Sequence, residues 1–181
     1  DYLGYDIDGD ADYDGDGVND LIIGAPEAET SSSGDSAGMV YIMLSNQLVD
    51  AGEIGVGESA YKFVGGYGSD RAGRSVAAAG DVDGDGMPDL LVGAHGNDDY
   101  TNASGAAYLV THANFPEDGE VFDLNNADFI FACASEYCDV GNGEGNTMDG
   151  LGDLDGDGLD AFIIGAKNSD LGYSNGGAAY I

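Results

Sequence analysis

Apolar residues in this chain occur in short runs separated by glycine, aspartate and serine. Segments such as Ser75–Gly80, Asp89–Gly93 and Ala106–Val110 have the length and composition of strands. No stretch of useful length between them has helical periodicity. The pattern therefore predicts an all-β fold built from many short strands.

One arrangement recurs three times along the chain. An acidic loop followed by an apolar strand occurs at Asp12–Ala25, Asp81–Ala94 and Asp153–Ala166, and these segments align without gaps at a spacing of about 70 residues. Each is preceded by a glycine-led segment and followed by a Gly-x-x-Tyr strand, at Gly4 and Gly38, Gly73 and Gly105, and Gly145 and Gly177. The chain is therefore expected to be an array of repeats.

Each repeat predicts four antiparallel strands. The first precedes the acidic loop, the second follows it, the third carries the Gly-x-x-Tyr pattern, and the fourth is Tyr61–Val64 or Asp128–Ala132. The second strands are Asp20–Gly24, Asp89–Gly93 and Phe162–Gly165. This is the composition of β-propeller blades built from four-stranded antiparallel sheets. We expect one array of three repeats with approximate bounds 1–64, 65–133 and 134–181.

The third repeat predicts only three strands, because the sequence reaches Ile181 within its Gly-x-x-Tyr strand. Propellers usually close with about four to eight blades. A partial propeller of about three blades leaves an open edge, and exposed edges pair readily. We therefore expect further blades or self-association as partners.

The charge balance narrows the range of binding partners that the chain can have. The chain has 35 acidic and 4 basic residues and a formal net charge of −31. Phosphate backbones and anionic membrane surfaces are repelled by such a charge, so nucleic acid is excluded as a partner. No apolar run approaches the length of a membrane span, so membrane insertion is not expected. Cations are the expected partners.

The acidic loop has the pattern D-x-D-G-D-G-x-x-D in its first two copies, with carboxylates at positions 1, 3, 5 and 9. Such crowded like charges favour a cation among them, and Ca²⁺ takes six to eight oxygen ligands. The glycine at position 6 allows a sharp turn. Position 12 holds Ile23, Val92 or Ile164 where an EF-hand requires Glu, so the loop is not an EF-hand. The alternative is a solvated acidic turn.

This layout resembles the FG-GAP repeats of integrin α-subunit propellers over nearly the whole chain. In that family the calcium loop joins the first and second strands of a blade. The family's Phe-Gly pair corresponds to Leu3-Gly4, Ala72-Gly73 and Glu144-Gly145, so the aromatic residue is missing.

The resemblance implies three groups of calcium ligands. The side-chain ligands are Asp12, Asp14, Asp16 and Asp20 in the first loop, Asp81, Asp83, Asp85 and Asp89 in the second, and Asp153, Asp155 and Asp157 in the third. The backbone carbonyls of Val18, Met87 and Leu159 can add one oxygen each. The third loop has Ala161 at position 9, and Asp160 stands one place early as a substitute ligand. We therefore expect two strong calcium sites and one weaker site.

Cys133 and Cys138 lie close together in the sequence. In an oxidising compartment they are expected to form a small-loop disulfide. The alternative is a buried thiol at Cys133 and an incidental one at Cys138.

The sequence contains no motif that indicates an enzyme. The pattern around Ser174 matches G-x-S-x-G, but it falls in a predicted loop between strands rather than at a strand-to-helix elbow. His95 and His112 have no cysteine or second histidine nearby. Asn102 begins a glycosylation sequon. We expect a chain that is not an enzyme.

The leading functional hypothesis is a secreted or cell-surface module for adhesion or recognition. The resemblance implies that a protein or glycan ligand binds loops opposite the calcium loops, with Tyr67, Arg71, Tyr100, Tyr137 and Tyr173 as candidate anchors. These loops are Pro26–Gly38, Gly65–Ala72, His95–Ser104, Ala134–Glu144 and Lys167–Gly176. The alternatives are a structural repeat that forms a filament or surface layer, and a propeller attached to a secreted enzyme.

Overall fold

A computed structural model describes residues 1–30, 36–48, 55–99, 104–117, 119–133, 138–142, 147–169 and 176–181. Within these residues the secondary structure consists of β-strands and four short 3₁₀ helices, with no α-helix. The all-β expectation is therefore confirmed. No helix in this part of the chain is long and apolar enough to cross a membrane.

The strands form three sheets. The first has the order β1-β2-β3-β4-β8, the second β5-β6-β7-β9 and the third β10-β11-β12. The bounds are β1 Ile7–Ala11, β2 Asp20–Ala25, β3 Met39–Met43, β4 Tyr61–Val64, β5 Ala72–Gly80, β6 Asp89–Ala94, β7 Ala106–Val110, β8 Phe122–Asp123, β9 Phe129–Ala132, β10 Met148–Gly152, β11 Ala161–Ala166 and β12 Ala178–Tyr180.

Neighbouring strands within each sheet pair antiparallel, as the repeat pattern predicts, except for β4 and β8 of the first sheet. Strands β4 and β7 have the predicted bounds, whereas β5 starts three residues before the predicted Ser75. The predicted Asp128 lies just before β9, whose pairing with β7 ends at Phe129, and its carboxylate accepts hydrogen bonds from Thr111 N (2.8 Å) and Asn114 Nδ2 (2.7 Å). The sheets are thus the blades that the sequence predicts.

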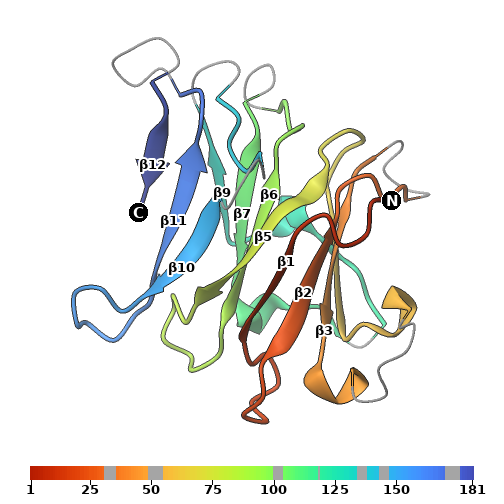
Figure 1. Cartoon of the computed structure of the whole chain (residues 1–181), viewed down its shortest axis with the longest axis vertical. Coiled ribbons are helices and arrows are strands. Elements are labelled where there is room, and N and C mark those ends of the chain that lie inside the picture. The colour runs from red at the N-terminus through yellow and green to blue at the C-terminus, as the bar shows by residue number, and fades with distance from the viewer. Residues whose placement is uncertain are drawn as a thin grey trace.

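The three sheets stand side by side, and their first strands β1, β5 and β10 are neighbours (Figure 1). The turns from the first to the second strand of each sheet gather at one end of the molecule, the lower end in Figure 1. Each sheet thereby presents its acidic loop at the same end.

Two hydrophobic cores fill the spaces between the sheets. One face of β6 and β7 places Val92 and Tyr108 against Ile22, Ile42 and residues around them in the first sheet. The opposite face places Leu91 and Leu109 with Met148 and Ile164 of the third sheet. Successive side chains of a strand point to opposite faces. The middle sheet is therefore buried on both faces, which explains its continuous apolar runs.

Glycines let the blades approach closely. A Cβ atom at Gly24 would overlap the carbonyl oxygen of Gly73 in the next repeat. A Cβ atom at Gly93 would lie 2.7 Å from the carbonyl oxygen of Gly141. Gly141 therefore occupies the place of Gly73 in the third repeat, where the gap-free alignment put Gly145, which lies outside the described residues.

Two features complete the fold. Strand β8 pairs parallel with β4 and extends the first sheet with a segment of the second repeat, an addition that the sequence pattern did not predict. Cys133 and Cys138 form the expected disulfide, with 6.1 Å between their Cα atoms.

Candidate metal centre

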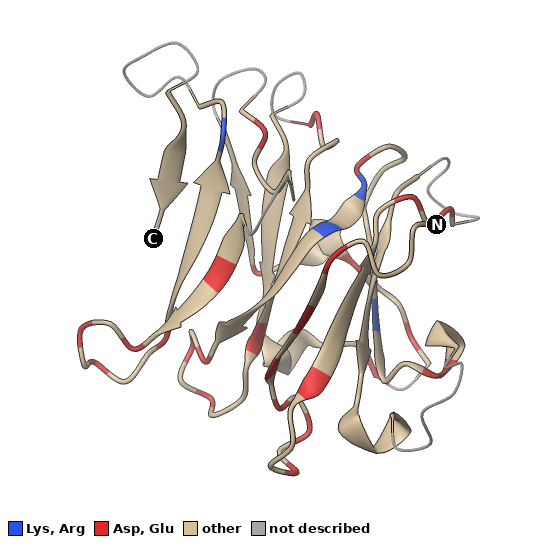
Figure 2. Ribbon diagram, viewed as in Figure 1, with Lys and Arg blue, Asp and Glu red and all other residues tan. Residues whose placement is uncertain are grey.

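The three acidic loops join β1 to β2, β5 to β6 and β10 to β11. Figure 2 shows acidic residues in all three turns at the lower end of the molecule. Most residues of these loops are exposed, whereas Asp20 and Asp89 at position 9 are buried.

The first carboxylate closes each loop through two backbone N–H groups. Asp12 accepts from Gly15 N at 2.8 Å and Gly17 N at 2.7 Å, and Asp81 accepts from Gly84 N at 2.8 Å and Gly86 N at 2.9 Å. The third loop repeats this pattern, with Asp153 accepting from Gly156 N at 2.7 Å and Gly158 N at 3.0 Å. These N–H groups, led by that of Gly17, lower the pKa of the Asp12 carboxyl. An ionised carboxylate therefore stands at the start of the loop.

The second and third carboxylates turn the backbone in the same way in every loop. In the first loop, Asp14 accepts from Asp16 N at 3.1 Å, and Asp16 accepts from Val18 N at 2.8 Å. The equivalent bonds run from Asp85 N to Asp83, from Met87 N to Asp85, from Asp157 N to Asp155 and from Leu159 N to Asp157. The glycines at positions 4 and 6 have φ angles between 74° and 94°, which other residues rarely adopt.

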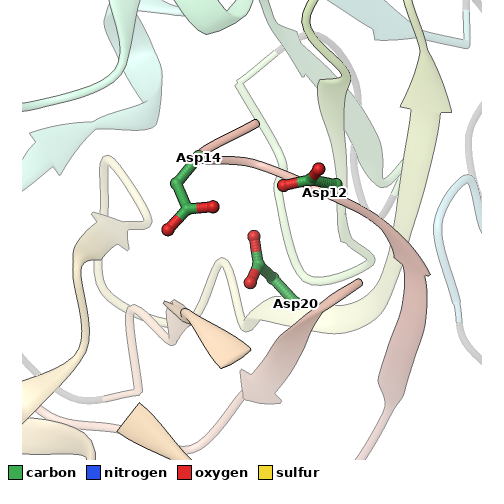
Figure 3. Close-up of side chains that lie close together, drawn as sticks. All are labelled: Asp12, Asp14 and Asp20. Atoms are coloured by element: carbon green, nitrogen blue, oxygen red, sulfur yellow. The ribbon is translucent and has the colours of Figure 1, made fainter. Parts of the chain in front are cut away.

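These turns bring carboxylate oxygens together. In each group the ligand atoms lie within 4.8 Å of one another, and the groups are Asp12, Asp14 and Asp20; Asp81, Asp83 and Asp85; and Asp153, Asp155 and Asp157. Figure 3 shows that the carboxylates of Asp12, Asp14 and Asp20 converge on a common space. In every repeat, three of the predicted side-chain ligands therefore lie together.

The aspartate at position 9 braces its loop. Asp20 accepts from Tyr13 N at 2.6 Å and from Ser45 N at 2.7 Å. Asp89 accepts from Val82 N at 2.9 Å and from His112 N at 2.8 Å. Burial raises the pKa of the Asp89 carboxyl to about 6, although these two N–H groups act against the rise. Both aspartates connect the loop to the second residue after the third strand of the blade.

Three predicted side chains lie outside the clusters. Asp16 and Asp89 do not share the oxygen clusters of their loops. Asp160 turns away from its own loop, because its carboxylate accepts from Asp81 N at 2.9 Å while its N–H donates to Asp81 O at 2.8 Å. The substitution of Asp160 for the position-9 ligand is therefore not seen. Asp160 instead connects the third loop to the second.

Two residues without a predicted role connect the first loop to the second blade. Tyr13 is 1% exposed, and its hydroxyl donates to Asp89 O at 3.3 Å. The His112 Nε2 atom lies 3.2 Å from Tyr13 O. An apolar or aromatic residue recurs at this loop position as Val82 and Leu154, and this was the available signal.

The opposite end of the molecule is only partly described. Tyr67 is 53% exposed there, and the Arg71 Nε atom lies 3.1 Å from Glu27 Oε1. The candidate anchors Tyr100, Tyr137 and Tyr173 lie outside the described residues, as do Asn102 and Ser174.

The chemistry of the acidic clusters fits a hard divalent cation. Three carboxylates supply oxygen atoms only, and Ca²⁺ prefers such ligands in flexible geometry. The loops are exposed, so water can supply further ligands. The side chains at each cluster therefore suit Ca²⁺ better than the nitrogen- and sulfur-preferring metals.

Comparison with known protein families gives a match to the FG-GAP repeat in two segments, residues 3–43 and 72–110. Each segment contains an acidic loop, the strands on either side of it and the strand that follows. The matched segments therefore coincide with the first three strands of the first and second blades.

Proposed function

Since this chain carries FG-GAP repeats and forms part of a β-propeller, we propose that it is a calcium-stabilised recognition module that acts outside the cell. The recurrence of one carboxylate cluster in all three repeats carries the calcium proposal. Acidic turns that bind no cation would not be expected to repeat the same hydrogen bonds in each loop.

The predicted ligands then have distinct roles. The carboxylates at position 1 bind Ca²⁺ and also accept hydrogen bonds from backbone N–H groups, so each of them connects the loop to the ion. These residues are Asp12, Asp81 and Asp153. The carboxylates at position 3 complete the cluster from its exposed side. The ion would offset the repulsion between like charges that lie a few ångströms apart.

Placement outside the cell rests on two features. FG-GAP repeats are typical of extracellular proteins, and the Cys133–Cys138 disulfide suits an oxidising compartment. Extracellular fluids also supply calcium at the concentrations that weaker modules require. We further propose that the module acts by binding a protein or glycan ligand and not by catalysis.

Calorimetric titration of the calcium-free chain with CaCl₂ and with MgCl₂ tests the metal proposal. We expect about three calcium ions per chain and weaker binding of Mg²⁺, because Mg²⁺ demands stricter geometry. Probing protein and glycan arrays with and without calcium tests recognition. Absence of calcium binding at millimolar concentrations would refute the first proposal, and an absence of any calcium-dependent ligand would refute the second.

A further inference from the structure

Positive charge is scarce in this chain, yet half of it lies in one place. Arg71 and Arg74 are two of its four basic residues. Arg74 lies in β5 and Arg71 directly precedes that strand, at the end opposite the acidic loop that follows β5. This concentration stands out against a net charge of −31.

Arg74 is held in a fixed orientation. Its Nε donates to Asn142 O at 2.8 Å, and its guanidinium carbon lies 4.4 Å from the ring centroid of Tyr5. Tyr5 and Arg74 occupy the same position in consecutive repeats, one residue after the glycine. A guanidinium fixed by stacking and by one hydrogen bond loses little freedom when it binds a planar anion.

The outer edge of this guanidinium has no protein partner in the part of the chain that the structure describes. Its terminal nitrogens donate no hydrogen bond there, and no carboxylate lies within ion-pair distance. Two parallel N–H donors at that edge match the two oxygens of a carboxylate.

The neighbouring side chains of His95 and Arg71 also favour an anionic ligand at Arg74. Burial, followed by the positive charges of Arg74 and Arg71, lowers the pKa of His95 to about 4, so its imidazole is neutral at physiological pH. The buried His95 Nδ1 atom has no hydrogen-bond partner among the described residues. Arg71 forms an ion pair with Glu27, whereas Arg74 forms none with the described residues.

We propose that Arg74, beside Arg71 and Tyr5, binds a carboxylate side chain of a protein partner. The partner segment carries this acid among basic or uncharged residues, because Glu27 and Asp139 near the site repel a polyanion. The proposal rests on the recognition function proposed above and specifies the chemistry of its ligand.

The test uses the full ¹⁵N-labelled chain in calcium and the peptide acetyl-Lys-Gly-Asp-Gly-Lys-amide as probe. We expect saturable shifts of the Arg74 Nε resonance and of the backbone amide resonances around residue 74, and the amide shifts also report on the variants. The dissociation constant should lie near the millimolar range, and the Asn-containing peptide should cause no shifts. Arg74→Lys should weaken binding by about fivefold or more through loss of the bidentate fork. Arg74→Gln should abolish it.

Lys62→Gln is the matched control, because it removes the same charge from β4 and should leave affinity unchanged. Equal losses in Arg74→Gln and Lys62→Gln would overturn the proposal, as would tighter binding of polyglutamate or of an oligogalacturonate. Calcium titration of every variant checks folding. Peptide binding without any calcium binding would refute the calcium proposal while leaving this site standing.

Discussion

At the scale of single residues, the blades meet through glycines that leave no room for a side chain. Gly24 faces Gly73, and Gly93 faces Gly141. These pairs join the end of the second strand of one blade to the start of the next. They give a physical reason for the glycines in the repeat that the sequence pattern alone does not supply.

Gly24→Ala should lower the free energy of unfolding by about 2–3 kcal/mol, because a Cβ atom there overlaps the Gly73 backbone. Urea unfolding in saturating calcium measures this change. Gly57→Ala is the control, since a Cβ atom at Gly57 meets nothing within 4 Å; its effect should stay within about 0.5 kcal/mol. Equal effects of the two changes would contradict the packing argument.

Asp70 is a buried acid whose ionisation opposes folding. It is 2% exposed, and burial, together with Asp99 and Asp98, raises its pKa to about 6, well above the ordinary range of an aspartate. Backbone Tyr67 N donates to its carboxylate at 2.9 Å. Because the pKa of Asp70 is raised in the folded state, its ionisation lowers the free energy of unfolding as the pH rises from about 4 through about 6.

Asp70→Asn should therefore gain stability relative to the wild type by about 2 kcal/mol when the pH is raised from 4.5 to 7.5. Urea unfolding at both pH values in excess calcium gives the change. Glu117→Gln alters an exposed carboxyl and serves as the control. A difference between Asp70→Asn and wild type that is independent of pH would show that Asp70 does not titrate in this window.

At the scale of elements, the third loop differs from the other two. Asp20 and Asp89 tie their loops to the residues after β3 and β7, whereas Ala161 has no carboxylate to do so. The three acids of the third cluster are all exposed, whereas Asp20 of the first is buried. The third loop keeps the same backbone turn but lacks the position-9 carboxylate that connects the other two loops to their blades.

We therefore expect the third site to bind calcium about tenfold more weakly than the first two. Asp14→Ala, Asp83→Ala and Asp155→Ala remove the same loop position from each site in turn. Calcium titration should show loss of a strong site in the first two variants and of the weak site in Asp155→Ala. Equal affinities at all three sites would disprove the role given to position 9.

Asp160 makes a direct link between the second and third loops. Asp160→Ala should destabilise the chain by about 1–2 kcal/mol, because Asp81 N then loses its acceptor. Asp160→Asn should retain most of the stability, since an amide oxygen can accept the same bond. Urea unfolding of both variants in calcium provides the comparison, and an equal loss in both would point to the charge rather than to the hydrogen bond.

At the scale of the whole molecule, negative charge is concentrated where calcium is proposed to bind (Figure 2). Each like-charge pair about 4 Å apart costs roughly 4 kcal/mol at an effective dielectric of 20. Domains have a net stability of only about 5–15 kcal/mol. Removal of the ions should therefore unfold or loosen the chain.

Thermal melts in calcium and in excess chelator should differ by about 10 °C or more. Adding about 1 M NaCl should raise the melting temperature of the chelated chain more than that of the loaded chain, because salt screens the exposed carboxylates. Circular dichroism and calorimetry both report this. A melting temperature that is unchanged by chelation would mean that the loops are stable without a cation.

The sequence by itself determined the elements and the clusters. Strand alternation and the recurring D-x-D-G-D-G pattern depend on neighbouring residues, so β4, β7 and the turns at Asp12, Asp81 and Asp153 could be predicted from local chemistry. The disulfide was expected from the close spacing of Cys133 and Cys138 together with an oxidising compartment, and the structure contains it.

Only the tertiary structure decided how the repeats meet. The use of Gly141 in place of Gly145, the turn of Asp160 toward Asp81, the pairing of β8 with β4 and the stacking of Arg74 on Tyr5 all join different repeats. Such contacts depend on the path of the backbone between blades, and a local pattern of residues carries no information about that path.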